Sequence, residues 1–336
     1  MGLQTTERTL EPVQTFIGSE GPVTSLCSVS SGSLAGHIIS GSSFAAVYVW
    51  DVEKRKRLTC KFRCDNRAPK NTTVFWTHPD ERDTAELFVH LRDGVCGVWK
   101  IIPSGAQALR NCKLNDQFGF CPGSAFDAQR TVCVPAGQIG NNNSGFVLLS
   151  QDTLEPVGAF IPSVDHSVPV RTCRYRDHEL FVVYEDATVA LWDVRSQNTP
   201  VFESDVFRKH PTMSSEDLGV PMALDVDATS GIGLLGTSSS LLQRFDILPA
   251  ELTLKDSIRM PEEGVSDVRI RSDGKICTVA SWDYTARVYS WKSLKPLVTL
   301  DMHRDTIQRV DYGIFDGKNC LVLGGKDELL TVWPLY

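Results

Sequence analysis

The sequence predicts an all-β fold, a seven-bladed β-propeller, because one short unit recurs along the chain. In four places an aspartate stands six residues before an aromatic residue that closes an apolar strand. These pairs are Asp93 and Trp99, Asp186 and Trp192, Asp283 and Tyr289, and Asp327 and Trp333. Weaker copies end at Trp50, Leu149 and Phe245. The seven end points are spaced by roughly 43 to 53 residues, close to the roughly 40 to 45 residues of a four-stranded propeller blade.

Apolar runs and the turns between them divide the chain into blades of a single domain, residues 1–336. Within each run, apolar and polar residues alternate as in half-buried strands, and Gly, Asp, Asn and Ser mark the turns. The pattern is weakest in blade three. We expect blades at residues 18–62, 71–113, 118–162, 168–207, 219–259, 264–302 and 305–336.

The last blade lacks an outer strand of its own. The sequence stops after LLTVWPLY, three strands into blade seven. At the other end, residues 12–26 (PVQTFIGSEGPVTSL) parallel residues 296–310 (PLVTLDMHRDTIQRV), which read as a strand, a turn and the first strand of a blade. We therefore expect a strand at 11–17 to complete the last blade. This closure, rather than an open or six-bladed ring, leaves no sheet edge exposed.

The repeated aspartates are expected to be structural. Each lies in the tight turn between two middle strands, where a carboxylate accepts backbone N–H bonds. The pattern resembles WD-repeat proteins, in which this aspartate also orients a histidine from the preceding loop. By that resemblance His166 and His303 are the candidates, whereas His37 stands at the start of a strand. Repetition around a ring is typical of a scaffold rather than of an active site.

Composition and motifs exclude several functions. The net charge is −7 and the pI about 5.5, so no direct nucleic-acid partner is expected. No run approaches the roughly 18 apolar residues of a membrane span, and the first residues lack a secretory core. The ten cysteines form no CxxC pair and read as free thiols in a reducing compartment, which predicts a cytoplasmic or nuclear protein.

No catalytic or ligand-binding motif in the sequence has both the required spacing and the required structural context. A GxGxxG match at 231–236 is followed by a turn and a strand, not by the helix that a dinucleotide site needs. Residues 313–318 resemble a phosphate loop with the wrong spacing. No nucleophile elbow and no metal-spaced histidine pair occur. We therefore expect no enzyme activity, metal, cofactor or small-molecule substrate.

The loops between blades are the expected partner-binding regions. Residues 204–219 form a long connection that mixes charge with apolar residues expected to be exposed, and long loops are often functional. Residues 54–57 (KRKR) are a basic tetrad, to be read as a solvated turn or as a nuclear import signal. The candidate partner-binding residues are Phe207, Arg208, Met213, Arg195, Arg63, Arg67 and Lys70.

Three segments carry a closer resemblance: YEDATVALWDVRS, VASWDYTARVYSWKSLKPLVTLDMHRDTIQRV and GGKDELLTVWPLY. They are similar to the family of guanine nucleotide-binding protein subunit beta-like protein 1 and ASTRA-associated protein 1. In that family the penultimate blade has a WD pair, then Tyr or Phe, then a second Trp; Trp282, Tyr289 and Trp291 fill those places here. The specific resemblance covers roughly the C-terminal half, and the general WD-repeat pattern nearly the whole chain.

The resemblance implies a non-enzymatic adaptor. Family members associate with the TTT co-chaperone complex, which supports maturation of phosphatidylinositol 3-kinase-related kinases, and some fungal members with the ASTRA assembly. A G-protein gamma partner is not expected, because no heptad helix precedes the first strand. An alternative is a substrate receptor of a cullin ubiquitin ligase, since residues 192–195 (WDVR) match the WDxR ending of such receptors.

Overall fold

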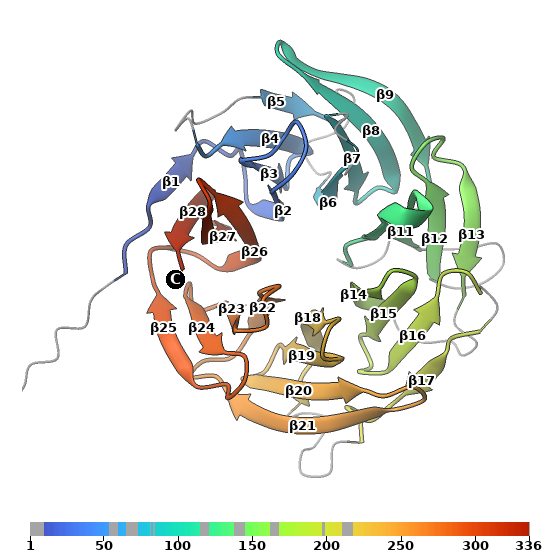
Figure 1. Ribbon diagram of the computed structural model, residues 1–336, viewed down its shortest axis with the longest axis vertical. Helices are drawn as coiled ribbons and strands as arrows, with labels where there is room; N and C mark the ends of the chain where they lie inside the picture. Colours follow the sequence, from blue (N-terminus) through green and yellow to red (C-terminus); the bar gives the residue numbers. More distant parts are fainter. Residues whose placement is uncertain are drawn as a thin grey trace, which may run out of the picture.

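The computed structural model describes residues 10–53, 60–64, 73–80, 82, 85–114, 121–137, 145–161, 168–196, 199–209 and 218–335. Seven four-stranded antiparallel sheets stand around a common axis like the blades of a propeller (Figure 1). The prediction of an all-β, seven-bladed fold is confirmed. His166, Arg67, Lys70, Met213 and residues 54–57 lie outside the described residues.

Six blades are continuous in sequence and run from an innermost to an outermost strand. Blades one and two comprise β2 (Val23–Val29), β3 (His37–Ser42), β4 (Ala46–Asp51) and β5 (Cys60–Arg63), then β6 (Val74–Pro79), β7 (Glu86–Leu91), β8 (Val95–Ile102) and β9 (Gly105–Lys113). Blade three comprises β10 (Ser124–Phe126), the 3-10 turn η1 (Asp127–Gln129), β11 (Thr131–Ala136), β12 (Gly145–Ser150) and β13 (Pro156–Phe160). Blade four comprises β14 (Pro169–Arg176), β15 (Glu179–Tyr184), β16 (Val189–Asp193) and β17 (Phe202–Ser204).

The remaining blades follow the same order. Blade five comprises β18 (Pro221–Asp227), β19 (Ile232–Thr237), β20 (Leu241–Ile247) and β21 (Leu252–Arg259). Blade six comprises β22 (Val265–Ile270), β23 (Ile276–Ser281), β24 (Ala286–Ser290) and β25 (Pro296–Leu300). Blade seven comprises β26 (Ile307–Phe315), β27 (Lys318–Gly325), β28 (Leu329–Pro334) and the N-terminal β1 (Gln14–Ile17).

The ring closes between the two ends of the chain. Strand β1 pairs antiparallel with β28, from Gln14 opposite Val332 to Ile17 opposite Leu329 (Figure 1). Phe16 of β1 is 1% exposed and packs on Trp50 of blade one, with ring centroids 5.3 Å apart. The expectation that an N-terminal strand completes the last blade is therefore confirmed. Closure of this kind removes the free sheet edges that would otherwise pair with other chains.

Burial of the strands follows their place in the blade. The middle strands, rich in Val, Ile and Leu, are buried on both faces, as in β15 (ELFVVY) and β4 (AVYVWD). The outer strands are more exposed, and in β25 (PLVTL) only the last residue, Leu300, is buried, because these strands form the rim of the ring and meet solvent. Adjacent blades approach closely at a small residue: a Cβ added to Gly41 would lie 2.4 Å from the side chain of Val74 in the next blade. Neighbouring sheets thus interlock through their apolar faces.

Candidate functional site: the central channel and its two mouths

The repeated aspartate of blade seven anchors a hydrogen-bond network. His303, in the loop before β26, donates from Nδ1 to the Asp327 carboxylate at 3.0 Å. Its Nε2 lies 3.0 Å from Oγ1 of Thr331, and Nε1–H of Trp333 donates to the same hydroxyl at 2.8 Å. Burial alone would raise the pKa of Asp327, but the bonds from His303 and from the Arg304 N–H hold it below its usual range.

The other repeated aspartates hold turns in the same way. Each accepts a backbone N–H two residues on: from Val95 at 3.4 Å, Thr188 at 3.0 Å and Thr285 at 3.1 Å. The residue after each aspartate has a left-handed backbone conformation, with φ of 81° at Gly94, 64° at Ala187, 69° at Tyr284 and 67° at Glu328. A carboxylate that satisfies the turn N–H offsets the strain of that conformation. Asp283 also binds Arg287.

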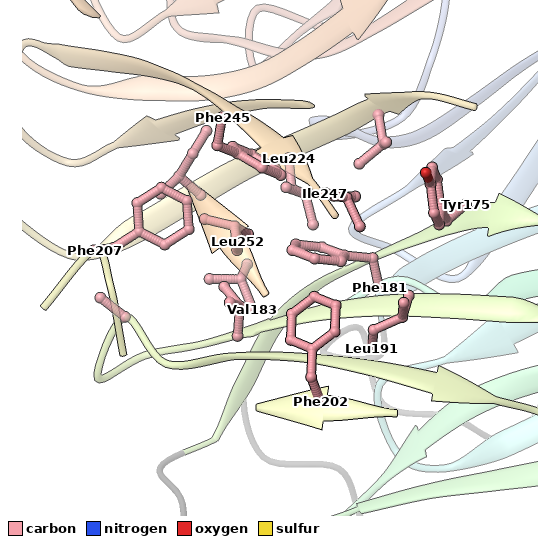
Figure 2. Close-up of a cluster of buried hydrophobic side chains, with 14 of the residues drawn as sticks. Tyr175, Phe181, Val183, Leu191, Phe202, Phe207, Leu224, Phe245, Ile247 and Leu252 are labelled. Carbon is pink, nitrogen blue, oxygen red and sulfur yellow. The ribbon is translucent and has the colours of Figure 1, made fainter. Parts of the chain in front are cut away.

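Phe207 corrects one expectation about the long connection between blades four and five. We expected this side chain to be exposed, but it is fully buried. Figure 2 shows it directed into the core between the two blades, where it meets Phe245 edge-on with ring centroids 5.4 Å apart. The sequence pattern failed because the gap between two neighbouring sheets is filled by a residue from the connection, which lies outside the strand periodicity. Phe207 is therefore not accessible to a partner.

Three of the candidate arginines lie at the surface, each beside a carboxylate. Arg195 is 61% exposed and contacts Asp193 two residues earlier, with Nη2 2.7 Å from the carboxylate. Arg63 contacts Glu20 at 3.1 Å, and Arg208 lies 3.9 Å from Asp186. Arg63 lies in blade one, Arg195 follows β16 of blade four, and Arg208 lies in the connection between blades four and five; each contacts a different carboxylate. Exposed pairs of this kind contribute roughly 0–1 kcal/mol each to stability.

Charged side chains converge instead on the central channel. Six first strands show a register shift near their start. The residue that follows the shift stands at an equivalent place in each: Ser25, Trp76, Arg171, Ala223, Asp267 and Arg309. We call Arg171, Asp267 and Arg309 the entry layer. Two residues further along, Asp225, Arg269 and Asp311 form what we call the exit layer, flanked by Cys173 and Cys27.

Carboxylates of both layers tie each blade to the next. Asp225 accepts the backbone N–H of Ile270 at 2.7 Å, and Asp311 accepts that of Ser28 at 2.6 Å. Asp267 accepts the N–H of Val310 at 3.0 Å. These bonds cross the boundaries between blades five and six, six and seven, and seven and one. The layers therefore help hold the ring closed.

Arginines of the entry layer bridge blades through carbonyl groups. Arg171 donates from Nε to the carbonyl of Met222 at 2.7 Å and from Nη2 to that of Ser266 at 2.8 Å. Its guanidinium also lies 3.4 Å from Asp267. Arg309 donates from Nε to the carbonyl of Thr24 at 2.8 Å. Burial and the nearby charge of Arg171 lower the pKa of Arg309 to about 9.

The exit layer has the opposite balance. Nη1 of Arg269 lies 3.6 Å from Asp225, and the charge of Arg269 also acts on Asp311. Burial raises the pKa of Asp225 and of Asp311, and the charge of Arg269 partly counters it. The entry layer therefore holds two arginines and one aspartate, and the exit layer two aspartates and one arginine. Positive charge is in excess on one side of the channel and negative charge on the other.

Both ends of the channel open into cavities. The entry mouth, where the first strands begin, has a volume of about 590 Å³, and both entry-layer arginines line it. The exit mouth, where those strands end, has a volume of about 480 Å³ and is lined by the exit layer. Apolar groups dominate the wall of the entry mouth: Pro22, Phe75, Val168, Pro169, Val170, Val220, Met222 and Trp282.

Trp282 is the exposed aromatic of the entry mouth. The residue begins a tight turn, and it is 41% exposed. The indole lies directly over Gly264, so close that a Cβ added there would be 2.1 Å from Cδ2 of Trp282. One face of the ring is thereby fixed against backbone while the rest borders the cavity. Val220, 37% exposed, lines the same mouth.

Sequence reasoning did not find this channel, although a signal was present. Charged residues alternate in the first strands, as in Asp267–Arg269 and Arg309–Asp311. Alternate residues share one face of a strand, so those pairs had to face the same way. The sequence places Trp282 in a repeat pattern, but it does not show that the turn containing Trp282 borders the central axis of the ring.

Other features of the described chain bear on function. The GxGxxG match lies mostly within β19 and is followed by β20. Among the described residues, no cluster of three or more His, Cys, Asp and Glu is arranged to hold a metal ion. In the same residues we find no helix with the length and apolarity required to cross a bilayer.

Comparison with known proteins confirms the resemblance and extends it. The chain is 24% identical over 329 residues to guanine nucleotide-binding protein subunit beta-like protein 1 from Mus musculus, covering 95% of this chain and 94% of that protein. It is 34% identical over 126 residues to ASTRA-associated protein 1 from Schizosaccharomyces pombe, covering 38% of this chain and 32% of that protein. Both proteins are among its relatives. No protein-family model matches the chain.

A solved structure supports the fold. The Raptor protein from Chaetomium thermophilum aligns over 98% of this chain and 29% of its own, with a TM-score of 0.78 and 11% identity. The likeness bears on the propeller architecture alone. Together, the propeller fold and relatives named as ASTRA-associated support a scaffold or adaptor role in protein–protein interaction.

Proposed function

We propose that this protein is a non-enzymatic adaptor of the TTT co-chaperone and ASTRA system, which supports the maturation and stability of phosphatidylinositol 3-kinase-related kinases. The observation that carries the proposal is the similarity to the mouse relative over 95% of this chain, together with relatives named for ASTRA association. The residues of the repeat that could have suggested catalysis, Asp327, His303 and Thr331, are engaged in a structural network.

The proposed partners are TTT subunits and the kinases themselves, met in the cytoplasm or the nucleus. A G-protein gamma subunit, nucleic acid, a membrane and a small-molecule substrate are not among them. The channel favours a protein partner, because its wide mouth combines an apolar wall with an exposed tryptophan. Tryptophan is enriched among the residues that contribute most to protein–protein binding.

Affinity purification of the tagged protein followed by mass spectrometry tests the proposal. We expect TTT subunits and large kinases of this class to be recovered, and we expect depletion of the protein to lower the steady-state amounts of those kinases. Recovery of neither group, with kinase amounts unchanged after depletion, would contradict the adaptor function.

A substrate receptor of a cullin ubiquitin ligase is the second candidate. The observation that favours it is the 61% exposure of Arg195 in the WDxR segment. Its Nε and Nη2 contacts to Asp193 give the arginine a local structural role as well. Loss of a cullin and its adaptor from purifications of the Arg195→Ala variant would support the receptor. Purifications without any cullin would exclude it.

A further inference from the structure

We propose that the entry mouth binds an extended acidic–apolar peptide segment of a partner protein, with a carboxylate side chain directed toward Arg171 and Arg309 and an apolar side chain against Trp282. The proposal deepens the adaptor function and rests on it. It names the docking site and the chemistry of the segment that the site recognises.

Charge complementarity is the first argument for this occupant. The entry layer holds two guanidinium groups and one carboxylate: Arg171 lies 3.4 Å from Asp267, and both arginines line the mouth. A second carboxylate brought in by a partner would neutralise this layer. Carboxylate–guanidinium hydrogen bonds are roughly twice as strong as neutral ones and strengthen where water is excluded.

Mutual repulsion between Arg171 and Arg309 also favours the binding of an anionic group. The charge of Arg171 disfavours the charged form of Arg309, as burial also does. Several of their donors already serve carbonyl groups of Met222, Ser266 and Thr24, which hold both guanidiniums in place. An anion entering the mouth would meet donors that need little reordering, which reduces the entropy lost on binding.

The wall of the mouth specifies the apolar part of the ligand. Pro22, Val220 and Met222 line the cavity beside Trp282, and its volume of about 590 Å³ falls in the range of roughly 300–1,000 Å³ typical of ligand pockets. Trp282 is held against Gly264, so its position is set before a partner arrives. A rigid exposed aromatic provides contact area at low entropic cost.

A peptide fits these features better than a nucleic acid does. The protein carries a net charge of −7, which opposes the approach of a polyanion. The positive excess is confined to one layer inside an apolar funnel and forms no basic stripe along which phosphates could bind. Glu185 is exposed and lines the same mouth, where a basic residue of a peptide could pair with it, whereas a nucleic acid has no cationic side chain to offer.

Selection of random peptides displayed on phage against the full chain tests the assignment. We expect enriched peptides to carry Asp or Glu close to an aromatic or aliphatic residue. Synthetic versions labelled with a fluorophore should bind at least about tenfold more weakly to Arg309→Gln and to Trp282→Ala. The matched control is Arg176→Gln, because Arg176 ends β14 at the exit side and is 57% exposed.

Several outcomes would overturn the proposal: no enrichment, enriched peptides without acidic residues, or equal binding to the wild type and both variants. Displacement of the selected peptide by a single-stranded RNA oligonucleotide would assign the mouth to nucleic acid instead. The melting temperature of each variant is measured to show whether it is folded. Trp282→Ala keeps the test decisive if Arg309→Gln fails to fold, because Trp282 is exposed and contributes less to the core.

Purification of TTT subunits with the same variants separates the two proposals. If the wild type and both variants recover TTT subunits equally, the adaptor function stands and the docking site is wrong. If peptides are selected at the mouth but no TTT subunit is recovered by the wild type, the docking site stands and the proposed function is wrong.

Discussion

His303 donates a hydrogen bond from Nδ1 to the carboxylate of Asp327, 3.0 Å away, and thereby fixes the loop before β26 to the turn between β27 and β28. The histidine side chain has no exposed surface, and its other ring nitrogen meets the hydroxyl of Thr331. Thr331 is fully buried as well, and the Asp327 side chain is 10% exposed. The arrangement has the members of a catalytic triad, but it stabilises the blade.

We expect Asp327→Ala to destabilise the protein more than Asp186→Ala or Asp283→Ala. Asp327 accepts bonds from His303 and from the N–H groups of Arg304 and Leu329, so its loss leaves the fully buried His303 without its carboxylate partner. The cost is about 3–5 kcal/mol for Asp327 and about 1–3 kcal/mol for each of the others. Urea unfolding of the three variants measures it, and equal losses in all three would contradict the ranking.

Closure of the ring is tested at neighbouring positions of β1. Phe16→Ala removes a side chain that is 1% exposed and packed on Trp50, so we expect a loss of about 3–5 kcal/mol. Ile17→Ala in the same strand is the control, because Ile17 is 63% exposed. Its cost should stay within about 0.5 kcal/mol. Calorimetric melting that shifts equally in both variants would argue against the closure contact.

The burial of Phe207 is tested by comparing its substitution with that of its exposed neighbour Arg208. Phe207→Ala should cost about 3–5 kcal/mol, since its ring fills the core between blades four and five. Arg208→Ala removes an exposed side chain 3.9 Å from Asp186 and should change stability by less than about 0.5 kcal/mol. Urea unfolding distinguishes the two. A nearly neutral Phe207→Ala would show that this residue is not part of the core.

The difference between Phe207 and Trp282 shows how far the sequence could predict this molecule. Repeat spacing predicted the fold and the role of β1, because a closed ring with period-two strands leaves few other arrangements. It did not predict which connection residues fill the gaps between blades or which turns border the axis. Those depend on how the sheets pack side by side, so Phe207 is buried although we expected it to be exposed, and the exposure of Trp282 at the channel was not predicted.

Acid sensitivity is expected from His90. Burial lowers its pKa to about 3, against 6.5 for the free side chain, so the folded protein holds it neutral while the unfolded chain takes up a proton. Below pH 6.5 the unfolded state therefore binds more protons, and stability falls by about 1.4 kcal/mol per pH unit until about pH 3. His90→Leu should remove this part of the slope, as followed by urea unfolding at several pH values.

Thr77→Val is the control for that experiment. Thr77 is buried in the same blade and does not ionise, so its substitution should shift stability without changing the pH slope. An unchanged slope in His90→Leu would mean that His90 is protonated in the folded protein, against the burial of its ring.

The position of Trp282 at the entry mouth is expected to depend on Gly264. Gly264 has φ of +91°, and a Cβ there would lie 2.1 Å from the indole. Gly264→Ala therefore combines backbone strain with a clash, and should both lower stability and displace the ring. Gly274→Ala is the matched control: φ is +64°, but the nearest atom would be 3.8 Å away. It should cost about 1 kcal/mol from strain alone. Tryptophan fluorescence that changes in Gly264→Ala and not in Gly274→Ala would place the indole on this glycine, whereas identical spectra and stabilities in the two variants would contradict that contact.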